Sequence, residues 1–66
     1  MWVFTERDVT RLLGLRPRRS AQLRRLGLLH APGESGSYGF RELVTLRVAN
    51  ALLDQGLTVR QLREAL

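Results

Sequence analysis

The chain has 66 residues, 44% of them hydrophobic, which limits it to one domain with one modest core. It contains no cysteine and one histidine, His30, so disulfides, thiolate metal sites and a histidine-based zinc site are excluded. No apolar run approaches the roughly 18 residues that cross a bilayer. The segment Met1-Trp2-Val3-Phe4 lacks the basic region of a secretory signal, and we therefore expect a cytoplasmic protein.

The charge balance is strongly basic. Eleven basic residues stand against six acidic ones, giving a net charge of +5, and every basic residue is arginine. One explanation is the codon bias of a GC-rich genome. The other is function, because arginine suits bidentate contacts to phosphate and guanine.

The first predicted helix covers about residues 6–13. Thr5 is its expected N-cap, and Asp8 occupies the capping-box position three residues later. Gly14 supplies the C-terminal stop. The spacing predicts one apolar stripe, made of Val9, Leu12 and Leu13.

The second predicted helix covers about residues 17–26, after a turn of only Gly14-Leu15-Arg16. Pro17 suits the first helical position, and Gly27 ends the helix. Leu23 and Leu26 mark its buried side. Two short helices joined by such a turn are typical of the helix-turn-helix motif.

Residues 30–39 are rich in Gly, Ser and Pro and predict a wing, as either a short hairpin or an irregular loop. The third helix is expected at about 40–54, with Gly39 as N-cap, and it is apolar on most of its circumference, which predicts a central core helix. The fourth is expected at about 59–66, with Thr58 and Gln61 as its capping pair.

The start of the second helix departs from the capping rules. Arg16 stands at the N-cap position, and Arg18 and Arg19 occupy the first turn. Cations there oppose the partial positive charge of the helix start. A local rule broken in this way favours a functional site whose missing partner is an anion, such as a DNA phosphate.

An exposed stripe is predicted on the same helix, opposite its buried side: Arg18, Ala21, Gln22 and Arg25. In a major groove, Gln22 and Arg18 would reach base edges and Arg25 a phosphate. Arg19 borders the apolar side, where it would either reach a phosphate or pack on the first helix. The alternative for the whole stripe is a solvated basic face.

Five segments of the chain are similar to the DNA-binding domain of the MerR family of bacterial transcription regulators. They are Phe4-Thr5-Glu6-Arg7-Asp8-Val9, Gly14-Leu15-Arg16-Pro17-Arg18, Arg24-Arg25-Leu26-Gly27-Leu28-Leu29, Tyr38-Gly39-Phe40-Arg41-Glu42-Leu43 and Gly56-Leu57-Thr58-Val59-Arg60-Gln61-Leu62. The resemblance implies a mainly all-α, winged helix-turn-helix domain spanning residues 1–66. It also implies recognition contacts from Arg18 and Arg25, with Tyr38 beside the DNA backbone.

The chain departs from the family pattern at several points. The wing is shorter and lacks the arginine that usually precedes the tyrosine, Ser20 replaces a core leucine, and Ala21 and Gln22 replace an arginine and an aromatic residue. The family dimerises through a long helix beyond the fourth, which this sequence does not contain. We therefore expect an isolated monomer that binds DNA weakly and gains affinity when copies pair.

An enzyme is not expected, and neither is a cofactor or metal. The carboxylates are spread over helix ends and loops, and the serines have no base nearby in sequence. Trp2, Phe4 and Phe40 are expected in or beside the core, Tyr38 either there or stacked on a base, and His30 in solvent or at a phosphate. Two functions stay open: sequence-specific binding of double-stranded DNA in the cytoplasmic nucleoid, or a protein-interaction module whose basic face binds an acidic protein partner.

Overall fold

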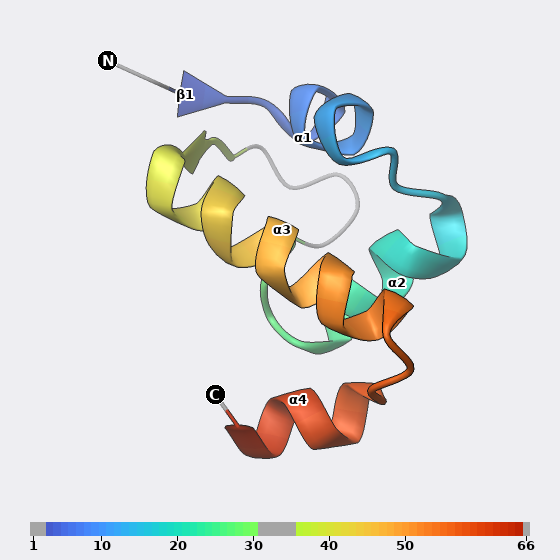
Figure 1. The fold of residues 1–66 in the computed structure, drawn as a ribbon. Helices are drawn as coiled ribbons and strands as arrows, with labels where there is room; N and C mark the ends of the chain where they lie inside the picture. The colour runs from blue at the N-terminus through green and yellow to red at the C-terminus, as the bar shows by residue number, and fades with distance from the viewer. Residues whose placement is uncertain (1–2, 31–35, 66) are drawn as a thin grey trace.

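The computed structural model describes residues 3–30 and 36–65. Over these residues the fold is mainly helical, with one small sheet (Figure 1). In chain order the elements are β1 (Val3–Phe4), α1 (Glu6–Leu13), α2 (Pro17–Arg25), β2 (Tyr38–Gly39), α3 (Phe40–Asp54) and α4 (Val59–Ala65). The four predicted helices are confirmed, although α2 ends one residue earlier than expected. Trp2, and the last residue expected in the fourth helix, lie outside the described residues.

The two strands come from distant parts of the chain. β1 and β2 pair antiparallel, with Val3 opposite Gly39 and Phe4 opposite Tyr38. The sequence predicted a hairpin or loop within residues 30–39, of which 31–35 are not described. The strand partner is instead the N-terminal segment, and a two-residue strand is too short to show the alternation by which strands are recognised.

Local capping explains where α1 and α4 begin. The Thr5 amide donates to Asp8 Oδ2 at 3.0 Å and the Asp8 amide to Thr5 Oγ1 at 3.1 Å. Thr58 and Gln61 form the same reciprocal pair, at 2.8 and 3.1 Å. Hydrogen bonding to the Thr5 backbone amide, and then to its side chain, lowers the pKa of the Asp8 carboxyl. Both predicted capping boxes are therefore present.

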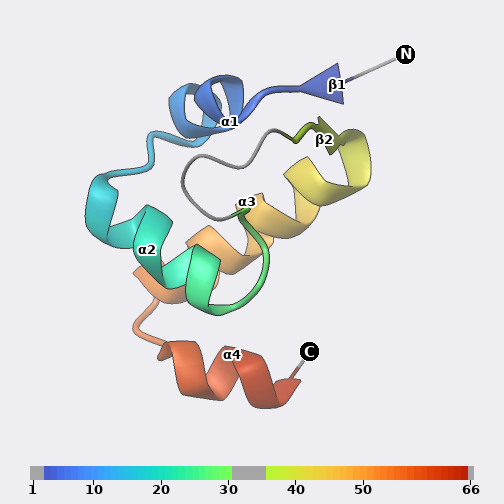
Figure 2. The same cartoon turned by 180° about the vertical axis from the view of Figure 1, so that it is seen from behind.

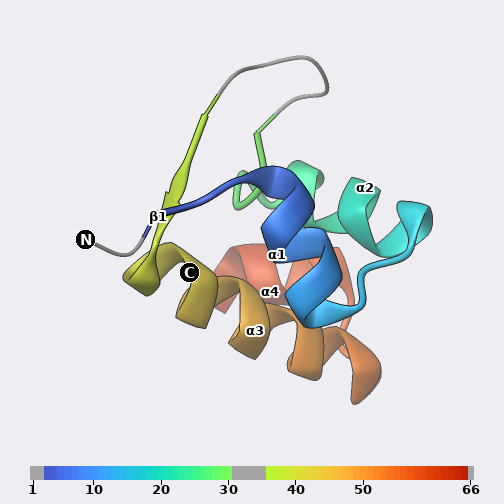
Figure 3. The same ribbon diagram turned by 90° about the horizontal axis from the view of Figure 1, so that it is seen from above.

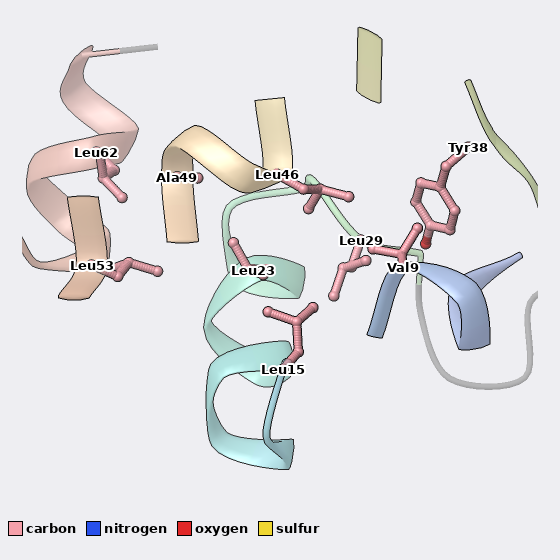
Figure 4. Packing of buried hydrophobic residues seen from close by; sticks show 9 residues of the cluster. All are labelled: Val9, Leu15, Leu23, Leu29, Tyr38, Leu46, Ala49, Leu53 and Leu62. Carbon is pink, nitrogen blue, oxygen red and sulfur yellow. The ribbon is translucent and has the colours of Figure 1, made fainter. Parts of the chain in front are cut away.

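α3 lies at the centre of the arrangement. In Figures 1 and 2 it runs between α1 and α4, and seen from above α1 and α2 lie on the same side of it (Figure 3). The buried hydrophobic side chains come from all four helices, β2 and the connections (Figure 4): Val9, Leu15, Leu23, Leu29, Tyr38, Leu46, Ala49, Leu53 and Leu62. This single core fixes α2 against α3 and thereby sets which face of α2 meets solvent.

The core covers less of α3 than the sequence predicted. Phe40 is 63% exposed, and Val44 and Val48, one and two turns further on, are also exposed. Leu12 of α1 is likewise exposed, although it shares a predicted apolar stripe with Val9. The prediction that Phe40 lies in or beside the core is wrong, because Phe40 shares with Val44 and Val48, at four-residue spacing, a face of α3 that points away from the buried Leu46.

Candidate nucleic-acid interface

A tight turn joins α1 to α2. Gly14 ends α1 in the left-handed region at φ 63°, a conformation that glycine adopts without strain. The next residue, Leu15, is buried, and its amide donates to Thr10 O at 2.9 Å. The chain thus enters α2 at Pro17 with its direction fixed by one buried side chain.

The start of α2 carries no side-chain cap. Arg16 is the N-cap residue, its side chain makes no capping hydrogen bond, and the first turn contains no acidic residue. The first backbone N–H groups of a helix have no partner within the helix, and Pro17 removes only one of them. The N-terminal end of α2 is therefore both electropositive and open to an acceptor from outside the helix.

The predicted stripe faces outward. Arg18, Ala21 and Arg25 are exposed and Gln22 is half-buried, whereas Leu23 on the opposite side is fully buried. The orientation of α2 inferred from its periodicity is therefore confirmed. Because α2 packs on the core through Leu23, its outer side presents Arg18, Ala21, Gln22 and Arg25 to solvent. We call these four residues the basic ridge.

Arg19 does not belong to that ridge. Its Nη1 lies 2.9 Å from Asp54 Oδ1 and donates to the backbone oxygen of Asn50 at 2.9 Å and to Asn50 Oδ1 at 2.6 Å. Its Nε donates to Gln22 Oε1 at 3.0 Å. The C-terminal half of α3 supplies these acceptors, so the predicted packing of Arg19 on the first helix is wrong, while the other alternative, a phosphate contact, stays a prediction.

Other arginines also serve the fold. Arg24 Nη2 lies 3.5 Å from Glu6 Oε1, a charge contact too loose to satisfy that buried oxygen by a hydrogen bond, and Arg24 Nε donates to His30 O at 3.2 Å. Arg63 Nη2 donates to Arg25 O at 2.6 Å, where a cation compensates the negative end of α2. Two of these contacts, Arg24 to Glu6 and Arg63 to Arg25, join segments far apart in the sequence, so no local sequence pattern predicts them.

Three arginines, the N-cap residue of α2 and two within the helix, stay free of such pairing within residues 3–30 and 36–65. No carboxylate there forms an ion pair with Arg16, Arg18 or Arg25. Arg16 and Arg18 line a hollow of about 480 Å³, together with Arg19, Gln22, Asn50 and Asp54. The hollow joins the uncapped helix start to the α2–α3 contact.

Tyr38 lies in the core. Its side chain is 1% exposed, its hydroxyl accepts a hydrogen bond from the His30 amide at 2.9 Å, and its ring centroid lies 4.7 Å from that of His30. A residue so enclosed has no surface to offer to a DNA backbone. The contact implied by the family resemblance is therefore corrected to a core role, and the half-buried His30 is less open to solvent than expected.

Comparison with family models, with curated proteins and with solved structures gave no match. Among the described helices, none is long and apolar enough to cross a membrane. Across the same residues no group of three acidic, histidine or cysteine side chains is placed to hold a metal ion.

Proposed function

We propose that the chain is a DNA-binding module of a MerR-like bacterial transcription regulator that acts in the cytoplasm at the nucleoid. In this proposal it is a winged helix-turn-helix, with α1 and α2 as the motif and residues 30–39 as the wing. The observation that carries the proposal is the start of α2, where Arg16 and Arg18 are exposed at an uncapped helix end without a carboxylate partner among the described residues.

The electrostatics of that helix end favour an external anion. Each exposed cation in the first turn costs about 0.3–1 kcal/mol against the helix dipole. A phosphate placed there accepts hydrogen bonds from free backbone N–H groups and neutralises the guanidiniums at the same time. DNA supplies such phosphates at regular spacing along a groove about 12 Å wide, which admits one helix.

The exposed side chains of α2 divide into positioning and reading groups. Arg16 and Arg25 contact phosphates at the two ends of the helix, while Arg18 and Gln22 face base edges between them. The proposal assigns no DNA contact to Arg19, which is paired with Asp54, or to Tyr38, which is buried. Contacts from only a few residues are consistent with weak binding by one copy, and a second copy on an adjacent half-site adds affinity.

The test is equilibrium binding of the fluorescently labelled chain to duplexes enriched from a random pool, measured between about 50 and 300 mM salt, a roughly sixfold range over which phosphate contacts weaken measurably. Neutralisation of two phosphates, by Arg16 and Arg25, predicts a log–log slope of about −1.8. A recurring sequence in the enriched pool supports specific recognition. Absence of duplex binding at the lowest salt, together with capture of an acidic protein on the same face, would overturn the proposal in favour of a protein-interaction module.

A further inference from the structure

Gln22 is the one amide on the outer side of α2, and its orientation is set by a neighbour. Arg19 precedes it by three residues on the same helix and donates from Nε to Gln22 Oε1 at 3.0 Å. Residues three apart on a helix are neighbours, so this bond forms without distorting either side chain. The carbonyl oxygen of Gln22 is therefore already engaged before any ligand arrives.

Arg19 is itself immobilised by α3. Its Nη1 contacts Asn50 through two oxygens and Asp54 through one, all within 2.9 Å, and its side chain is 22% exposed. A planar guanidinium held on one edge by Nη1 presents its Nε–H in a fixed direction. The orientation of the Gln22 amide thus derives from the C-terminal half of α3, and Arg19 transmits it.

The free donors of Gln22 lie on its nitrogen, while the second lone pair of its oxygen lies next to the positively charged Arg19 guanidinium. A glutamine side chain carries one acceptor oxygen and an NH₂ group with two donors. Among the described residues no acceptor bonds to Gln22 Nε2, and the side chain lines the hollow beside Arg16 and Arg18. A ligand that enters this region on the α2 side meets the Gln22 N–H donors and the guanidiniums of Arg16 and Arg18, while the Asp54 carboxylate on the α3 side is paired with Arg19.

We propose that Arg19 is a positioning residue that makes Gln22 a donor-only reader of base edges, selecting guanine through its O6 and N7 acceptors. This inference rests on the proposed DNA-binding function and adds its base preference. Glutamine recognises adenine by donating to N7 and accepting from the N6 amino group. Here the N6 amino group of an adenine at the Gln22 carbonyl would lie close to the Arg19 guanidinium, and the two groups, both hydrogen-bond donors, would repel each other. The positive charge of the guanidinium favours a base edge that carries acceptors instead.

The experiment measures base preference as a ratio of dissociation constants, which is insensitive to general changes in charge. The parent chain and its variants are titrated onto an enriched duplex in which each base pair is replaced in turn. We expect one position to prefer G·C over A·T by about 10-fold, the size of one good base contact. Gln22→Ala is expected to reduce this ratio to about 1 at that position only.

Two further variants separate reading from positioning. Gln22→Glu is isosteric and keeps an oxygen for Arg19, but it presents an acceptor outward, so the preference at that position is expected to change to cytosine, whose N4 donates. Arg19→Lys keeps the charge and the pairing with Asp54 but lacks the fork that also reaches Gln22. It is expected to reduce the G·C preference to within about 2-fold with the helix content unchanged by circular dichroism.

Asp54→Asn is the matched control, because Arg19 keeps its contacts to Asn50 and Gln22 and the preference should persist. An adenine preference that depends on Gln22, or base ratios that Gln22→Ala leaves unchanged, would overturn the inference while DNA binding stands. Failure of the parent chain to bind any duplex would overturn the proposed function and this inference with it.

Discussion

A buried hydroxyl ties the strand β2 to the end of the connection that leaves α2. Tyr38 carries that hydroxyl into the core, where it accepts the His30 amide hydrogen at 2.9 Å. An amide removed from water without an acceptor costs about 1–3 kcal/mol. The bond therefore holds the beginning and the end of the 30–39 segment together, a structural task that leaves the hydroxyl unavailable to a ligand.

Tyr38→Phe tests this assignment. We expect it to destabilise the fold by about 1–3 kcal/mol, since the His30 amide loses its acceptor, and each kcal/mol lowers the Tm of a domain of this size by roughly 4–8 °C. Affinity for DNA, measured well below the Tm, should not change. Phe40→Leu is the control, because that ring is 63% exposed and its replacement should alter stability by less than about 0.5 kcal/mol. Unchanged thermal stability with weakened DNA binding would instead return Tyr38 to the interface.

At the scale of elements, α2 differs from α1 and α4 in how it begins, and it differs from α3, which also lacks a side-chain cap, in having no acidic residue in its first turn. α1 and α4 start with reciprocal Thr–Asp and Thr–Gln pairs, whereas α2 starts with an arginine that makes no capping hydrogen bond. The helix is stable nonetheless because Leu23 is fully buried and Arg19 is held by α3. Tertiary contacts thus replace the local cap and leave the helix start free.

Arg16→Asp installs the missing cap and tests whether stability and binding oppose each other at this helix end. A capping carboxylate at the N-cap accepts from the first-turn amides and complements the dipole, so we expect a gain of about 0.5–2 kcal/mol in the free energy of unfolding. The same carboxylate repels a phosphate, so DNA affinity should fall. The control is Thr5→Ala, which should lose about 1 kcal/mol of stability without specifically affecting binding. A more stable variant that binds DNA like the parent would show that phosphates do not approach α2 at its start.

At the scale of the whole molecule, the features that depend on interactions within a few residues could be predicted from the sequence, and those that depend on contacts between distant segments could not. The bounds of α1 and α3 follow from caps, glycines and periodicity, all of which act within a few residues, and the outward face of α2 follows from Leu23. The ion-pair partner of Arg19, Asp54, lies on another helix, and the strand partner of Tyr38, Phe4, lies near the N-terminus. One sequence contains no local signal for either contact, so neither the ion pair of Arg19 nor the strand pairing of Tyr38 could be predicted from it.

The distribution of charge over the molecule gives the sharpest test of the interface. If binding reflects only the net charge of +5, any two exposed arginines contribute equally. If α2 is the contact surface, the double variant Arg16→Ala/Arg25→Ala should reduce the magnitude of the log–log salt slope by up to about 1.8, since each of the two phosphate contacts contributes about 0.9. The charge-matched control Arg41→Ala/Arg47→Ala, at exposed positions of α3, should leave the slope nearly unchanged. If the salt slope falls equally in the two double variants, DNA is attracted by the overall charge of the protein and α2 is not its specific contact surface.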